Sequence, residues 1–119
     1  MDKIELKQRT KNYALRVIKA VEALPHERVA NVLGKQLLRS GTSVGANYRA
    51  ACRAKSSADF VNKLKIVEEE CDESLYWMEL MVEAGVMPEN KLGQLMIEGD
   101  ELLAITVASI KRSRSAGGS

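Results

Sequence analysis

The sequence predicts an all-α protein, folded as an antiparallel up-and-down four-helix bundle. Three observations lead to this prediction. Apolar residues recur every three or four positions over four long segments, which is the spacing of one face of a helix. Only two prolines, Pro25 and Pro88, interrupt the 119 residues, and both lie between these segments. Aromatic residues make up only 4% of the chain, whereas β-sandwiches and barrels are rich in them.

The length and the short breaks between segments indicate one domain. We expect a four-helix bundle over residues 1–112, with helices at about 3–24, 27–54, 57–83 and 88–110. Residues 113–119 read as a disordered tail that is basic and ends in glycine and serine.

The first segment carries its apolar stripe on Leu6, Thr10, Tyr13 and Val17, at alternating steps of three and four. Pro25 ends it, because proline disfavours the helical conformation at the preceding residue. Bases cover much of the remaining surface of this helix: Lys7, Arg9, Lys11, Arg16 and Lys19.

The second segment contains an unusual stretch, Leu38–Arg49, with two glycines, two serines and a threonine. Such a composition is typical of a loop. The apolar spacing nevertheless continues across it without a break, on Leu33, Leu37, Val44, Tyr48 and Ala51. We therefore expect a helix whose small residues mark the place where another helix comes close.

The third segment starts at a good capping residue, Ser56, with Asp59 three residues later. Its apolar arc is wide, which predicts burial against more than one neighbour, another subunit included.

Gly85 suits the end of this helix and Pro88 the first turn of the fourth. The fourth segment carries its stripe on residues that include Leu92, Leu102 and Ile110.

The net charge of +2 conceals an asymmetry along the chain. Residues 1–55 hold 12 Lys and Arg against 4 Asp and Glu, whereas residues 56–101 hold 3 against 12. One interpretation is that basic and acidic helices neutralise each other when they pack. The other is that a basic face meets an acidic partner such as RNA.

Several kinds of site are disfavoured by the residues present. The Gly41–Gly45 stretch lacks the lysine and the preceding strand of a phosphate-binding loop. The single histidine, His26, excludes a di-iron site built from two Glu-x-x-His motifs, and it leaves Cys52 and Cys71 without the partners of a zinc site. No activated nucleophile is visible. We expect a protein that is not an enzyme and has no cofactor, metal or small-molecule substrate.

Two further features of the sequence indicate the cellular compartment of the protein. Two cysteines in helical segments do not make a disulfide framework. No apolar run approaches the length of about 20 residues that a membrane helix needs, and charged residues interrupt the N-terminal region. We expect a cytoplasmic protein that does not contact a membrane.

The basic residues near the central stretch and the C-terminus are the candidate contacts for a nucleic acid or a protein partner. Arginine binds phosphate groups through two parallel hydrogen bonds, which suits such a role. Tyr48 is the only aromatic residue close by, so the pattern has little specificity for RNA. The candidate residues are Arg39, Arg49, Arg53, Lys55, Lys111, Arg112 and Arg114.

Two blocks of the sequence carry a family resemblance. The run LLRSGTSVGANYRAA at residues 37–51 resembles the "L-R-S-small-x-S-small/apolar-x-A-N" signature of the bacterial large-subunit ribosomal RNA intervening-sequence proteins. The run at residues 55–77 is similar to a second block of the same family, with Asp59-Phe60, Lys63-Leu64 and Tyr76-Trp77 in the expected places. Residues 48–51 depart from the commonest pattern, which continues with an acid and a glycine.

The resemblance implies a four-helix bundle that assembles as a ring, often a homopentamer. A related branch includes the accessory protein of diversity-generating retroelements, which binds a reverse transcriptase and nucleic acid. The family supplies no catalytic residues. Two functional hypotheses follow: a non-enzymatic homo-oligomer that contacts RNA or a nucleic-acid-processing protein through a basic surface, and a purely structural or protein-interaction module whose charges neutralise each other internally.

Overall fold

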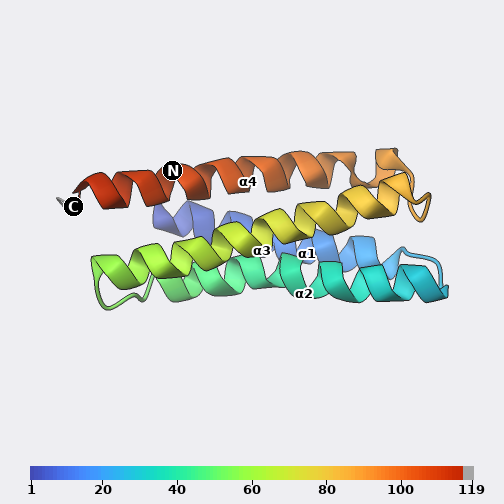
Figure 1. Cartoon of the computed structure of the whole chain (residues 1–119), viewed down its shortest axis with the longest axis horizontal. Helices are drawn as coiled ribbons and strands as arrows, with labels where there is room; N and C mark the ends of the chain where they lie inside the picture. Colours follow the sequence, from blue (N-terminus) through green and yellow to red (C-terminus); the bar gives the residue numbers. More distant parts are fainter. Residues whose placement is uncertain (117–119) are drawn as a thin grey trace.

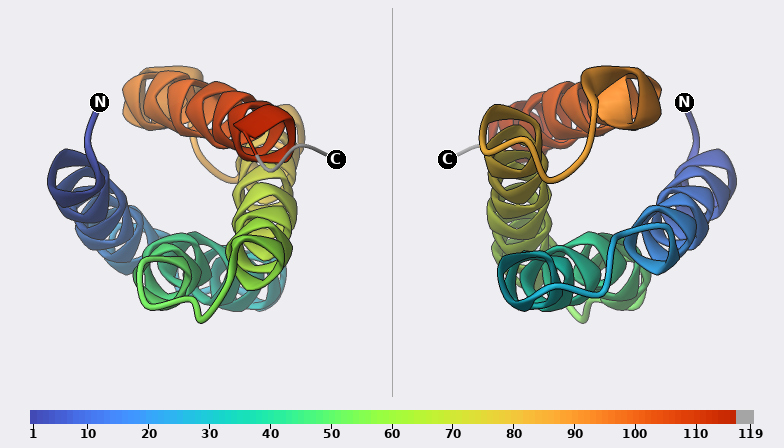
Figure 2. Two further views of the ribbon diagram at one scale, coloured as in Figure 1. Left: turned by 90° about the vertical axis from the view of Figure 1, so that its left-hand side faces the viewer. Right: turned by 90° about the vertical axis from the view of Figure 1, so that its right-hand side faces the viewer.

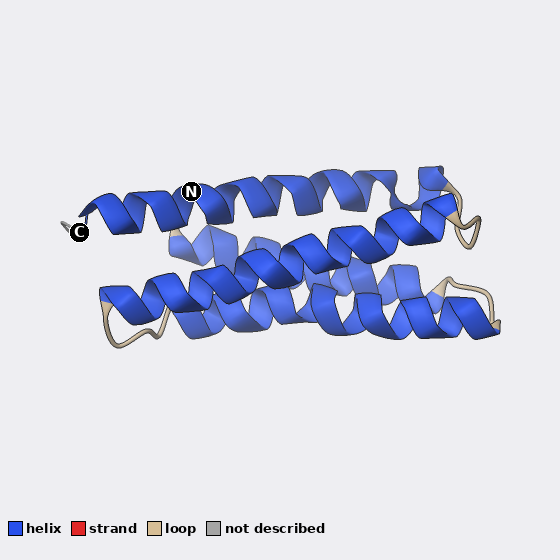
Figure 3. Cartoon of the chain, viewed as in Figure 1, coloured by secondary structure: helices blue, strands red, loops and turns tan. Residues whose placement is uncertain are grey.

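The computed structural model describes residues 1–116 and confirms the all-α prediction. Its four helices are α1 (Lys3–Glu22), α2 (Arg28–Ala51), α3 (Ser57–Glu83) and α4 (Glu89–Ala116), and short turns join them. No strand occurs among these residues (Figure 3). Consecutive helices run antiparallel and lie side by side (Figure 1). Viewed end-on, they surround one core in the order α1, α2, α3, α4 (Figure 2).

The helix boundaries follow from local capping. Asp2 precedes α1 and its Oδ1 accepts a hydrogen bond from the Glu5 N–H at 2.8 Å. Ser56 caps α3 in the same way, since its Oγ accepts from the Asp59 N–H at 3.0 Å. At the other end of α3, Gly85 has a positive φ of 73°, and the Val86 N–H donates to the Met81 carbonyl at 2.9 Å. This is the pattern of a helix that ends on a left-handed glycine.

Three of the predicted ends differ from the structure. Helix α1 ends at Glu22 instead of 24, because the residue before Pro25 is not helical. Helix α2 ends at Ala51 instead of 54, since the chain needs these residues for the turn that leads to the Ser56 cap. Helix α4 continues to Ala116 instead of 110, because no glycine or proline interrupts residues 111–116 and cations suit the last turn of a helix. The predicted tail is therefore helical over 113–116, and its residues 117–119 lie outside the described part.

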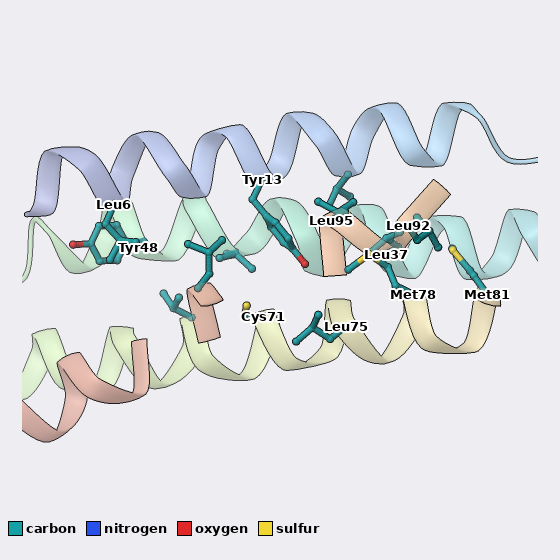
Figure 4. Close-up of a cluster of buried hydrophobic side chains, with 14 of the residues drawn as sticks. Leu6, Tyr13, Leu37, Tyr48, Cys71, Leu75, Met78, Met81, Leu92 and Leu95 are labelled. Atoms are coloured by element: carbon teal, nitrogen blue, oxygen red, sulfur yellow. The ribbon is translucent and has the colours of Figure 1, made fainter. Parts of the chain in front are cut away.

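The core lies along the whole length of the bundle and contains residues from all four helices (Figure 4). Two of its polar side chains pair with each other: the Tyr13 hydroxyl lies 2.8 Å from Ser74 Oγ, and Ser74 Oγ also donates to the Cys71 carbonyl at 2.7 Å. The buried Nε1 of Trp77 has no hydrogen-bond partner within the described residues. Completely buried side chains include Val17, Leu37, Val44, Leu64, Met78 and Leu92. The apolar periodicity of each segment thus identified the correct face.

The glycine-rich stretch lies at a close crossing of α1 and α2. A Cβ added at Gly41 would lie 2.7 Å from Val17 Cγ2, and one at Gly45 would lie 3.1 Å from the carbonyl oxygen of Thr10. Real Cβ atoms are rarely found so close to other atoms, so α1 and α2 approach each other only because these positions lack side chains. The stretch is helical, as predicted, and its small residues serve packing.

Candidate nucleic-acid interface

Six of the seven predicted contact residues lie at one end of the bundle. Arg49 is in the last turn of α2, and Arg53 and Lys55 are in the turn that follows it. The cations near the end of α4 lie at the same end of the molecule, to the left in Figure 1, where the N-terminus of α1 also begins. With Lys3 they form what we call the basic end: Lys3, Arg49, Arg53, Lys55, Lys111, Arg112 and Arg114.

A groove of about 390 Å³ joins the chain segments of the basic end. The start of α1 contributes Lys3, the turn between α2 and α3 contributes Lys55, and α4 contributes Ser113. The ammonium group of Lys3 lies 4.9 Å from the centroid of the Phe60 ring, at the edge of the same groove. Cations that are distant in sequence are therefore neighbours in space.

Two acids at this end, Asp2 and Asp59, take part in helix capping, and a third, Glu5, is exposed in the first turn of α1. The Oδ2 of Asp59 accepts a hydrogen bond from the backbone N–H of Lys55 at 3.2 Å, and Asp2 holds the first turn of α1. Within residues 1–116, no carboxylate lies within ion-pair distance of Arg49, Arg53 or Lys55. All three side chains are exposed. Their positive charge is thus available to a partner.

Arg39, the seventh predicted residue, lies apart from the others and has partners within the chain. Its guanidinium pairs with Glu70 at 3.2 Å and with Glu73, both on α3. The nearby carboxylates, Glu73 first, raise the pKa of Arg39 above its ordinary value. Arg39 therefore links α2 to α3 across the surface of the bundle.

A second basic groove lies along α1 and α2, and the sequence analysis did not identify it. It has a volume of about 540 Å³ and is lined by Lys7, Lys11 and Arg49, with no acidic residue among the lining side chains. Gly45 and Ala46 leave room for it. Lys7 and Lys11 were visible as bases one turn apart, but only the crossing of the two helices shows that they face Arg49.

Arg9, another base of α1, is bound within the bundle. Its Nη2 and Nε lie 2.6 and 2.9 Å from the two carboxylate oxygens of Glu98 on α4, and Glu101 lies 3.6 Å away. The hydrogen bond to Glu98 is the main reason that the pKa of Arg9 is raised. This paired geometry ties α1 to α4, two helices whose mutual contact is the weakest in the bundle.

The acidic counterpart of these surfaces is the outer face of α3. Glu69, Asp72, Glu79 and Glu83 are exposed there, one or two turns apart, and surround Tyr76, which is 52% exposed. None of these four acids forms an ion pair within the described residues. Two ion-pair clusters thus neutralise part of the charge, but most of the asymmetry seen in the sequence remains on separate surfaces.

Three further features concern the metal-binding, thiol and membrane chemistry of the described part of the chain. No group of three His, Cys, Asp or Glu side chains is placed to hold a metal ion there. Burial raises the pKa of the Cys71 thiol to about 12, and its Sγ donates to the Gly99 carbonyl at 3.3 Å. No helix within residues 1–116 is long and apolar enough to cross a membrane.

Comparison with known proteins gives a family-model match and similar solved structures. The model of a family described as "23S rRNA-intervening sequence protein" matches residues 2–108. A crystal structure from Bacteroides thetaiotaomicron, described as a protein of unknown function from the S23 ribosomal protein family, is similar with a TM-score of 0.84. It is 35% identical over 89% of this chain and 98% of its own. No curated protein matches the chain.

Proposed function

Because the chain belongs to the 23S rRNA-intervening sequence protein family, we propose that it is a non-enzymatic, self-associating helical scaffold that binds RNA through its basic end. The observation that carries the proposal is the gathering of exposed cations from three helix termini and one turn, where two of the nearby acids, Asp2 and Asp59, are engaged in capping. Lysine and arginine that neutralise phosphates supply most of the affinity of non-specific nucleic-acid binding.

A simpler interpretation of the same cations must be weighed. Bases in the last turn of a helix stabilise it by about 0.3–1 kcal/mol through the helix dipole, and α2 and α4 both end here. That role accounts for Arg49 and Arg114, which lie in last turns. It does not account for Lys3, at the positive end of α1, or for Lys55, just before the positive end of α3. These two lysines favour an anionic partner.

The test of RNA binding is a fluorescence-anisotropy titration with a structured RNA at about 50 and 200 mM salt. We expect the double variant Arg53→Glu/Lys55→Glu to lose more than tenfold in affinity. The matched control is Arg28→Glu/Lys35→Glu, which makes the same change in net charge at two exposed positions in the other half of α2. Equal loss in both variants would show that the basic end has no special role.

Self-association is supported by the complementary sides of the bundle. The α1–α2 groove carries Lys7 and Lys11 beside Ile4, which is 77% exposed, whereas the outer face of α3 carries acids around Tyr76. Helices α1 and α3 lie at opposite corners of the bundle (Figure 2). A contact between these two unlike faces leaves the pair of copies with one free face of each kind, and such contacts close into rings when the rotation permits. We propose a homo-oligomeric ring, with the pentamer as its preferred form.

Light scattering tests the assembly. We expect a mass several times the 13.1 kDa of one chain, a loss of assembly in Lys7→Glu/Lys11→Glu, and its recovery when Glu69→Lys/Asp72→Lys is added to the same chain. A monomer of wild-type protein at micromolar concentration would contradict the assembly. It would also favour the second candidate, a module in which charge serves only internal packing, if RNA binding were absent as well.

A further inference from the structure

Four of the five aromatic side chains of the protein are buried or lie in the acidic part of α3. Tyr13 and Tyr48 are buried, at 0% and 4% exposure. Tyr76 and Trp77 lie against each other in the acidic part of α3, with ring centroids 5.2 Å apart. Phe60 alone lines a groove of the basic end, and the Lys3 ammonium group lies over its ring. No free aromatic face is therefore offered beside the cations.

This arrangement matters because single-stranded nucleic acids are bound largely by stacking. Each base stacked on an aromatic ring contributes about 1–3 kcal/mol, and a positively charged groove then follows the backbone. The basic end has the cations but not the stacking surface. What it offers instead are lysines and arginines, with the hydroxyl groups of Ser57 and Ser113 in the same groove, all suited to phosphate and sugar.

The shape of the basic end also differs from a channel for one strand. The bundle is 21 by 19 Å in cross-section, and the cations of this end come from α1, α2, α4 and the turn that leads into α3. A double helix carries one charge per ~1.7 Å of its axis, about twice the linear density of a single strand at ~3.4 Å. A rigid duplex therefore presents a higher density of phosphates to a face of this width than a single strand does.

From these observations we infer that the basic end binds double-stranded RNA through its phosphate backbone and discriminates against single strands. The inference rests on the proposed function and specifies its substrate class. Its basis is electrostatic. Each phosphate that the protein neutralises steepens the plot of log affinity against log salt concentration, by about 0.9 for a duplex and about 0.7 for a single strand. Base sequence has little influence, because no side chain here is placed to read base edges in a wide, flat contact.

The experiment compares two RNAs of equal length: a hairpin with a stem of about 16 base pairs and an unstructured single strand. Anisotropy titrations at about 50–200 mM salt should give at least tenfold tighter binding of the hairpin and a steeper salt dependence. Scrambling the stem sequence while keeping its pairing should change the affinity less than threefold.

Phe60→Leu separates stacking from electrostatics, because leucine keeps the apolar contact of this partly buried side chain. We expect unchanged affinity for both RNAs. Single-strand binding as tight as hairpin binding, or a loss of single-strand affinity in Phe60→Leu, would overturn this inference alone. Failure of both RNAs to bind at about 50 mM salt would overturn the proposed function and this inference together.

Discussion

Two neighbouring regions of α2 have different tasks. Its middle, Ser40–Gly45, is where α1 packs: Ser40, Gly41 and Val44 are buried, and a side chain at Gly41 would collide with Val17. Its carboxyl end and the following turn, Arg49–Lys55, carry exposed cations without partners in the described chain. The family signature spans the first region and stops near the second. The most recognisable part of the sequence therefore specifies packing, and the charge that we connect with function lies just beyond it.

The largest effect should come from a charge placed in the packing region. Val44 is completely buried, so in Val44→Asp an unpaired carboxylate would enter the core. We expect a loss of about 4 kcal/mol or more in the free energy of unfolding, a large part of the ~5–15 kcal/mol of an ordinary protein. Urea denaturation measures it. Ala46→Asp, two residues away and exposed, should cost less than about 1 kcal/mol, and similar losses in the two variants would refute the face assignment.

A smaller effect of the same kind is expected at Gly41. The added methyl group of Gly41→Ala would lie 2.7 and 2.8 Å from the two γ-carbons of Val17, which cannot both turn away. Overpacking of this kind costs about 1–3 kcal/mol. At Gly93, also helical, nothing lies within 4 Å of the new carbon, so Gly93→Ala should stabilise by up to about 1 kcal/mol. Thermal unfolding of both variants should give shifts of opposite sign, and a stabilised Gly41→Ala would show that the helices do not cross as described.

The smallest effect is expected at Arg39, which lies between the two regions in sequence. Its guanidinium is half-exposed and its carboxylate partners are near the surface, where ion pairs contribute little. Arg39→Gln should leave both the midpoint of unfolding and the affinity for RNA close to wild type. A clear loss of RNA affinity would place Arg39 in the interface after all, and the basic end would then extend along α2.

The fold was predictable because it depends on periodicity. The apolar steps that run through Leu37, Val44 and Tyr48 continue across the glycines, and they predicted both the helix and its buried face. The site was predictable only in part, because charge pairing depends on where helices cross. Arg39 meets Glu70 and Glu73 because of the way α2 is aligned along α3. Lys7 and Arg49 line the same groove because of the way α1 is aligned along α2. Neither alignment is visible in a single sequence.

The ends of the helices illustrate the same limit. Capping signals at Ser56 and Gly85 predicted the bounds of α3 correctly. The end of α4 had no such signal before Gly117, and its basic residues were interpreted as a tail although they continue the helix to Ala116. This correction matters for function, because Lys111 and Arg112 are thereby held on a helix at the basic end.

The most direct test of the account is the salt dependence of hairpin RNA binding in wild type and in Arg53→Glu/Lys55→Glu. If the basic end binds phosphates, the plot of log affinity against log salt for the wild type has a slope of several units. The variant, with two cations removed, should lose about 2 units of slope with no change in the free energy of unfolding. A flat wild-type dependence, or an unchanged slope in a variant that folds normally, would contradict the central claim that these cations form the RNA interface.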